Sequence, residues 1–217
     1  MALYVHYGCG LTAPDEWMNF DASPTLRLQL LPVAGGVFRR YLAPRFPTNV
    51  LFGDIVRGLP GVADSSCAAV FCSHVLEHLP LHDARRAIGN TYRMLEPGGV
   101  FRCVVPDLGV QARDYIAGLV KGEPGSATEF LVESKLGVVE CTPGIAARVR
   151  RLFGHSAHLW MWDEPSLREE LATVGFREIS RVSYGDSSEK AFAQVEDEGR
   201  FDRSLAFQAI KPIGRNP

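Results

Sequence analysis

No stretch of this sequence approaches the roughly 18 consecutive apolar residues that a membrane-spanning helix requires. The first residues, MALYVHYG, also lack the basic and apolar regions of a secretory signal peptide. We therefore expect a cytoplasmic protein with no membrane partner.

A strong excess of charge of either sign is missing as well. The chain has 23 Lys and Arg against 25 Asp and Glu, which gives a formal net charge of −2. Proteins that bind nucleic acids usually carry a basic surface, because contacts with phosphates supply much of the affinity. The balance therefore argues against a nucleic-acid partner. The length of 217 residues fits one domain with a sizeable core.

Cysteine pairs with a recognisable spacing are absent too. The five cysteines are odd in number and scattered, and neither CxxC nor another zinc-binding spacing occurs. Most of them lie in apolar runs, which favours buried free thiols. Cys9 is the exception, because it lies between two glycines, where its backbone N–H is the expected contribution.

The most informative stretch is residues 3–21, LYVHYGCGLTAPDEWMNFD. A short run rich in Tyr and Val breaks at Gly8 and Gly10, and a second apolar run ends in Asp21. This pattern predicts a strand, a glycine turn, a second strand and a carboxylate. Glycines let a backbone approach a ligand closely. An acidic side chain at a strand end can accept two hydrogen bonds from a ribose diol.

The spacing within this stretch separates two kinds of nucleotide. Gly8-x-Gly10-x-x-Ala13 satisfies the dinucleotide fingerprint, which also requires a following helix and an acidic residue about 20 positions on. Pro14 follows at once, and Asp21 comes too soon for a helix to fit. A nucleoside without phosphates, such as S-adenosylmethionine, needs no such helix. A dinucleotide oxidoreductase and a plain tight turn between two strands remain the alternatives.

A second carboxylate follows another strand. Residues 50–52 form a brief apolar run that ends at Gly53 and Asp54, and open α/β sheets bind ligands at the carboxyl ends of their strands. Asp54 can accept a hydrogen bond from the exocyclic amine of an adenine, or it can serve as a turn residue. Residues 68–72 indicate a central strand buried on both faces, followed by a helix and by a strand at 100–105.

Five motifs occur in order along the chain. They are Gly8-Cys9-Gly10, WMNFD at residues 17–21, Gly53-Asp54, SHVLEHL at residues 73–79 and YRMLEPGG at residues 92–99. This combination resembles class I S-adenosylmethionine-dependent methyltransferases, and it is most similar to a small bacterial type 11-like group with an abbreviated first nucleotide motif. The resemblance covers residues 3–107 and resumes at residues 158–176.

The resemblance implies an α/β, Rossmann-like class I methyltransferase fold. Its seven-stranded sheet has the order 3-2-1-4-5-7-6, and the last strand is antiparallel. Residues 177–184 and 205–210, the two remaining alternating or apolar runs, would supply the sixth and seventh strands. The helix that usually follows the first strand is missing, and residues 25–46 are expected to cover that part of the sheet. Residues 108–158 would form a helical cap inserted in a single domain, 1–217.

The resemblance also assigns the contacts with S-adenosylmethionine. The glycine turn would line the methionine moiety, Asp21 would hold the ribose hydroxyls, and Asp54 with Ile55 would face adenine. Ser73 and His74 would lie beside the sulfonium and the reacting methyl. The full set expected to bind the cofactor is Tyr7, Gly8, Cys9, Gly10, Asp21, Ala22, Gly53, Asp54, Ile55, Ser73 and His74.

His74 is the residue expected to act as a general base, because imidazole titrates near neutrality and this one follows a central strand. A structural histidine at a helix start is the alternative. His74, His78 and His82 recur every four residues, a spacing that suits a metal on one helix face. Pro80 interrupts that face, so we expect no metal at this site.

The expected activity is methyl transfer from S-adenosylmethionine to an oxygen or nitrogen of a small-molecule acceptor, with S-adenosylhomocysteine as product. The acceptor site is expected to include Tyr115, His155 and His158, which lie in the predicted cap. A noncatalytic domain that binds the nucleoside as a sensor or partner subunit is the alternative. A homodimer is left open.

Overall fold

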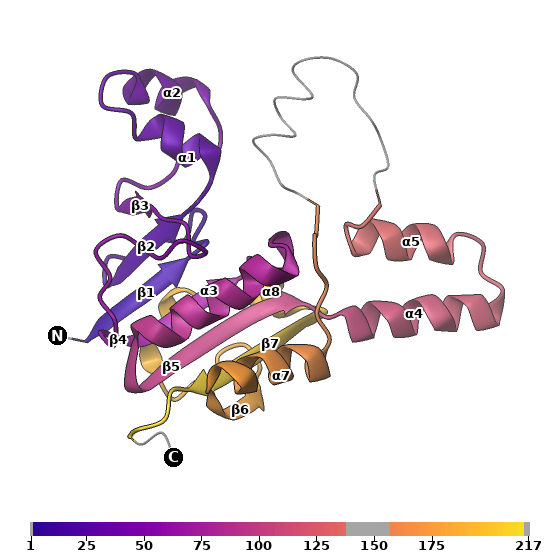
Figure 1. Cartoon of the computed structure of the whole chain (residues 1–217). Coiled ribbons are helices and arrows are strands. Elements are labelled where there is room, and N and C mark those ends of the chain that lie inside the picture. Colours follow the sequence, from indigo (N-terminus) through magenta and orange to yellow (C-terminus); the bar gives the residue numbers. More distant parts are fainter. Residues whose placement is uncertain (1, 138–156, 215–217) are drawn as a thin grey trace.

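The computed structural model describes residues 2–137 and 157–214. Within them, one mixed sheet has the strand order β3-β2-β1-β4-β5-β7-β6, which confirms the predicted order (Figure 1). The strands are β1 (Leu3–Tyr7), β2 (Trp17–Asp21), β3 (Val50–Phe52), β4 (Cys67–Ser73), β5 (Leu95–Pro106), β6 (Arg177–Arg181) and β7 (Ser204–Ile210).

The sheet is parallel from β3 to β5 and antiparallel beyond it. Strand β1 pairs in parallel with β2 and β4, and β5 pairs in parallel with β4. Strand β7 runs antiparallel to β5, and β6 runs antiparallel to β7. The five parallel strands therefore end at one edge of the sheet, where a ligand of an open α/β fold binds.

Apolar side chains cover both faces of the central strand β4, as its continuous apolar sequence predicts. Val70 and Cys72 pack in the larger core cluster, beneath the helices α3 (Leu81–Met94) and α7 (Glu164–Val174). Ala69 and Phe71 face the opposite side. The short helices η2 (Lys190–Gln194) and α8 (Glu198–Phe201) follow β6 on the chain, and Phe192 of η2 packs against that second face.

The pattern of buried residues in α3 explains why residues 81–94 form a helix. Its buried residues recur with the period of one helix face, and they are Ala84, Ala87, Ile88, Thr91 and Met94. Before it, the 3-10 helix η1 (Leu76–His78) follows β4 closely and ends at His78, and Pro80 is the N-cap of α3. The tight turn of η1 brings the side chains of residues 73–79 close to the strand ends.

No helix lies between β1 and β2, so the predicted absence of the first crossover helix is confirmed. Instead, α1 (Pro24–Gln29) and α2 (Gly35–Tyr41) follow β2 and lie beyond β3, at that end of the sheet (Figure 1). Ser23 caps α1 through its side chain, and Pro24 is its first residue, as expected for a helix start.

The insertion after β5 begins with α4 (Leu108–Lys121), which ends at Gly122 in the left-handed conformation, and continues with α5 (Ser126–Glu133). The two helices project away from the sheet (Figure 1). Residues 138–156 of the predicted cap lie outside the described residues. None of the described helices is long and apolar enough to cross a membrane.

Candidate functional site

The strand register brings the predicted cofactor residues to one edge of the sheet. Tyr7, the last residue of β1, pairs with Phe20 on one side and with Cys72 on the other. Asp21 pairs with Phe52, the last residue of β3. The glycine turn, Asp21, Gly53-Asp54 and Ser73-His74 therefore lie where the strands β1 to β4 end, and these ends are neighbours in space.

The glycine turn is packed against the segment that follows β4. Gly8 has a φ of +66°, and a Cβ atom there would lie 2.2 Å from Cγ2 of Val75. Only a residue without a side chain fits both the backbone conformation and the space. The next residue, Cys9, donates its backbone N–H to the carbonyl of Phe20 at 3.1 Å. Burial, followed by the charge of Asp21, raises the pKa of the Cys9 thiol to about 12, so the thiol stays protonated.

Both carboxylate oxygens of Asp21 accept backbone hydrogen bonds. Gly10 donates its N–H to Oδ2 at 3.1 Å, and Ser23 donates its N–H to Oδ1 at 2.7 Å. Each carboxylate oxygen has two lone pairs, so each keeps one acceptor position for a further donor. The carboxylate is thus oriented by the backbone and remains able to accept two more hydrogen bonds. The exposed Ala22 lies beside it.

The loop after β3 carries the second predicted carboxylate. The backbone N–H of buried Gly53 donates to the carbonyl of Asp21 at 3.2 Å, which ties this loop to β2. Asp54 accepts the N–H of Val56 at 2.9 Å through Oδ1, so it is also a turn residue. Ile55 is buried in the main core, and Asn90 of α3 donates to its carbonyl at 2.7 Å.

Strand β4 delivers Ser73 and His74. Ser73 is buried, and its hydroxyl has no hydrogen-bond partner among the described residues. His74 has a φ of +55°, uncommon for a residue with a side chain. Its backbone N–H donates to the carbonyl of Val104 at 2.9 Å. Its Nε2 lies 3.0 Å from the carbonyl oxygen of Arg200, and its Nδ1 lies 3.1 Å from Oε1 of Glu77.

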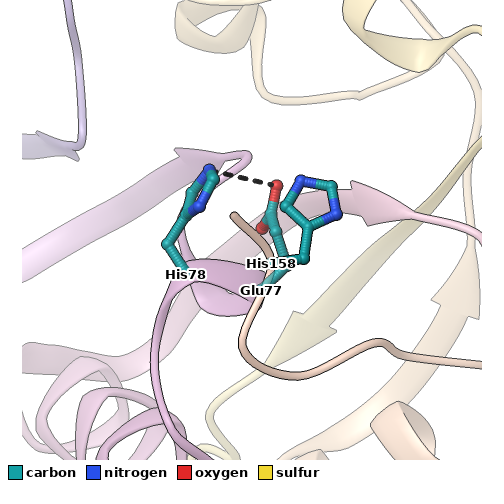
Figure 2. A group of neighbouring side chains, drawn as sticks. All are labelled: Glu77, His78 and His158. Carbon is teal, nitrogen blue, oxygen red and sulfur yellow. Dashed lines mark ion pairs between the residues drawn. The ribbon is translucent and has the colours of Figure 1, made fainter. Parts of the chain in front are cut away.

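A cluster of one carboxylate and imidazole rings lies directly after β4. Figure 2 shows the carboxylate of Glu77 between the rings of His78 and His158. The ligand atoms of these three residues all lie within 4.8 Å of one another. Glu77 is fully buried. The rings of His78 and His158 pack edge to face, with their centroids 5.1 Å apart. Burial lowers the pKa of His158, which favours the neutral imidazole.

Sequence reasoning missed this cluster. The spacing in the sequence drew attention to a metal only for His74, His78 and His82. In the structure the side chain of His82 is 84% exposed in the first turn of α3, and it does not join the group. The signal that could have found the cluster is His74-x-x-Glu77-His78, three chemically active residues within one turn. The third residue of the cluster, His158, comes from a distant part of the chain.

The remaining predicted residues lie in different places. The side chain of Tyr7 is buried in the core, where Thr91 donates its hydroxyl to the Tyr7 hydroxyl at 3.2 Å, so only the backbone of Tyr7 reaches the strand edge. Tyr115 lines a cavity of about 160 Å³ between α4 and α5. His155 lies outside the described residues. Of the predicted acceptor residues, the structure therefore brings only His158 to the end of β4.

Comparisons with known proteins agree with this geometry. Residues 6–103 match the family model described as a methyltransferase domain. No curated protein matches the sequence.

Similar solved structures include a methyltransferase from Thermotoga maritima described as a possible histamine N-methyltransferase. It is 15% identical with a TM-score of 0.51, and the match covers 97% of this chain and 83% of that one. An S-adenosylmethionine-dependent methyltransferase from Archaeoglobus fulgidus is 14% identical with a TM-score of 0.49, over 97% and 86% of the chains. A putative methyltransferase from Haloferax volcanii, solved with the Trm112 methyltransferase activator, is 16% identical with a TM-score of 0.48, over 97% and 83%.

The strand order confirms the predicted class I methyltransferase fold, and residues 6–103 match the methyltransferase domain model.

Proposed function

We propose that this chain, whose residues 6–103 match the methyltransferase domain family, transfers a methyl group from S-adenosylmethionine to an oxygen or nitrogen of a small-molecule acceptor. The observation that carries the proposal is the pre-oriented carboxylate of Asp21 at the shared edge of β1, β2 and β4. It keeps two acceptor positions for the two hydroxyls of a ribose.

The other cofactor contacts follow from the neighbouring strand ends. The open face of the glycine turn receives the methionine moiety, because a Cβ atom at Gly10 would meet nothing within 4 Å. Asp54 faces the adenine, with the buried Ile55 supporting its loop from below. Ala22 and the backbone of Tyr7 and Gly53 complete the wall. This arrangement supports a nucleoside ligand, and it offers no helix N-terminus for the pyrophosphate of a dinucleotide.

The methyl group is then expected beside Ser73 and His74, at the end of β4. The reaction is an in-line displacement at a sulfonium, so alignment of the acceptor is the main task and can supply about 7 to 11 kcal/mol. His74 is the proposed base for an acceptor that carries a proton, and to take that proton its ring must turn one nitrogen away from its present protein contact. Its ring is held between Glu77 and the carbonyl of Arg200, which fixes its orientation.

An isothermal titration with S-adenosylmethionine tests the proposal. We expect binding at sub-millimolar concentrations and none with NAD. Absence of binding at these concentrations would contradict the cofactor assignment.

Turnover separates the enzyme from a sensor that binds the nucleoside without reacting. Incubation with S-adenosylmethionine labelled in its methyl group and a panel of small alcohols, phenols and amines should give a labelled product. In His74→Asn, which tolerates the same backbone conformation, we expect reduced turnover with unchanged cofactor affinity. Binding without any labelled product would favour the sensor. A cytoplasmic location and a homodimer remain predictions.

A further inference from the structure

The side chain of Glu77 presents an unusual electrostatic problem. It is fully buried, and within residues 2–137 and 157–214 no well-aligned hydrogen bond reaches either of its carboxylate oxygens. A buried carboxylate without donors costs free energy, because it loses its hydration and gains nothing in return. Such a group needs a nearby cation. The nearest nitrogen atoms, in the described part of the chain, belong to histidines: Nδ1 of His74 at 3.1 Å and Nε2 of His78 at 4.0 Å.

The ring of His78 is oriented as a metal ligand would be. Its Nδ1 lies 3.1 Å from the carbonyl oxygen of Ala157. A carbonyl only accepts hydrogen bonds, so Nδ1 must carry the proton, and Nε2 then turns its lone pair toward Glu77. Metal-binding histidines typically donate their other ring N–H to a carbonyl or a carboxylate in this way.

His158 completes the group from the other side. It is 5% exposed, and neither ring nitrogen has a hydrogen-bond partner among the described residues. Its position is fixed by the backbone, because Leu159 and Trp160 donate their N–H groups to the carbonyl of Glu77 at 2.7 and 3.1 Å. The segment that carries His158 is thus joined directly to the residue that carries the carboxylate.

We propose that Glu77, His78 and His158 bind a divalent transition-metal ion at the carboxyl end of β4. His74 positions the carboxylate through its contact with Glu77 and does not bind the metal itself. This proposal departs from the sequence-based expectation of no metal, which concerned a helix face that includes His82.

The donor set indicates the class of ion. Two imidazole nitrogens and one carboxylate oxygen suit zinc, iron(II) and related ions, whereas magnesium and calcium prefer oxygen ligands. Ligand bonds of about 2.0 to 2.2 Å require the three donor atoms to approach one another more closely than the present 4.8 Å limit. We expect rotations of the three side chains to bring these atoms together, because the backbone of Glu77 is already hydrogen-bonded to Leu159 and Trp160.

Three protein ligands leave a coordination position open, as in catalytic zinc sites. The cluster lies next to Ser73 and His74, where the acceptor is expected. An ion there would lower the pKa of an acceptor hydroxyl bound to it. This use of the ion rests on the proposed function, whereas metal binding itself does not.

Metal titration of the untagged full chain, after treatment with a chelator, tests the proposal. We expect one zinc ion per chain by elemental analysis. Cobalt(II) should give the visible absorption bands of a low-coordinate nitrogen and oxygen site. His158→Ala and Glu77→Gln should each weaken zinc binding by roughly 100-fold or more, since removal of even an outer partner costs 10- to 100-fold. The control is His82→Ala, which removes an exposed histidine outside the cluster and should bind zinc normally.

Two results would overturn the proposal. One is the absence of stoichiometric zinc or cobalt binding in the folded wild-type chain. The other is unchanged zinc affinity in His158→Ala and His78→Ala, each shown by circular dichroism to be folded. Cofactor binding measured on the same samples keeps this test separate from the proposed function, because loss of the ion should leave the Asp21 contacts with S-adenosylhomocysteine in place.

Discussion

Two carboxylates near the strand ends are built in opposite ways. Asp21 is partly exposed, and two backbone N–H groups orient it. Glu77 is fully buried, and within the described residues its carboxylate lies close to the rings of His74 and His78. An oriented, hydrated carboxylate suits neutral donors such as ribose hydroxyls. A buried carboxylate among histidine rings requires positive charge nearby, so the two residues are suited to different ligands.

The largest effect that tests this contrast concerns Glu77. Free zinc at about 1,000 times its Kd should raise the free energy of unfolding of the wild-type chain by up to about 4 kcal/mol, by mass action. Glu77→Gln should show almost none of this stabilisation, because it lacks the charged ligand. Without metal, the variant should be at least as stable as the wild type, since it no longer buries an unsolvated charge. Urea denaturation with and without zinc measures both quantities.

Asp21→Asn provides the matching control in the other region. It should keep the full zinc-dependent stabilisation, because Asp21 is not part of the histidine cluster. Equal zinc stabilisation of the wild type and Glu77→Gln would remove the contrast between the two carboxylates.

An intermediate effect is expected at Gly8, where the glycine turn packs against the segment that follows β4. A methyl group there would lie 2.2 Å from Cγ2 of Val75, and the φ of +66° disfavours any side chain. Gly8→Ala should therefore lower the free energy of unfolding by about 1 to 3 kcal/mol and weaken cofactor binding. The double variant Gly8→Ala/Val75→Ala should recover the part of this loss in unfolding free energy that the clash with Val75 causes. Chemical denaturation measures both variants.

Gly36→Ala is the matched control, because its added Cβ atom would meet nothing within 4 Å and the residue lies in helix α2. It should be neutral or slightly stabilising. A loss at Gly36 as large as the loss at Gly8 would show that the turn has no special packing.

The smallest effect concerns His6. Like Glu77, His6 is a buried titratable group, and its neighbours do not stabilise its charged form. Its ring packs against Trp17 and Phe71. Burial, followed by the charge of Arg200, lowers the pKa of His6 from 6.5 to about 3. Between these values the unfolded chain binds a proton that the folded chain does not, so stability falls as the pH falls.

For one group this slope is at most about 1.4 kcal/mol per pH unit. His6→Phe, which stays uncharged, should show a shallower decrease in the free energy of unfolding between pH 6.5 and pH 4 than the wild type. Identical slopes in urea denaturation would indicate that His6 is protonated in the folded state.

The strands and the glycine turn could be predicted from the sequence because they depend on local patterns. The run at residues 3–7, the break at Gly8 and the carboxylate at residue 21 are close in the chain, and each follows from composition and spacing. The strand order came from the family resemblance, because pairing between distant strands leaves no local signal.

The histidine cluster could not be predicted in the same way. Nothing in the sequence indicates that His158 lies beside Glu77, because that contact depends on the backbone hydrogen bonds of Leu159 and Trp160. The spacing of His74, His78 and His82 pointed to a helix face, but η1 ends at His78 and His82 is exposed on the next helix, α3. Likewise, the burial of the Tyr7 side chain depends on packing against α3, which the strand pattern alone does not specify.

The central claim is that Asp21 holds the ribose of the cofactor at the shared strand edge, and titration with S-adenosylhomocysteine tests it most directly. Asp21→Asn keeps the shape of the side chain but loses its charge and acceptor capacity. We expect it to weaken binding by about 1 to 3 kcal/mol, the cost of losing charged hydrogen bonds. Asp15→Asn, a change at an exposed carboxylate that contacts Asn49, should bind normally. Unchanged affinity in a folded Asp21→Asn variant would contradict the assignment.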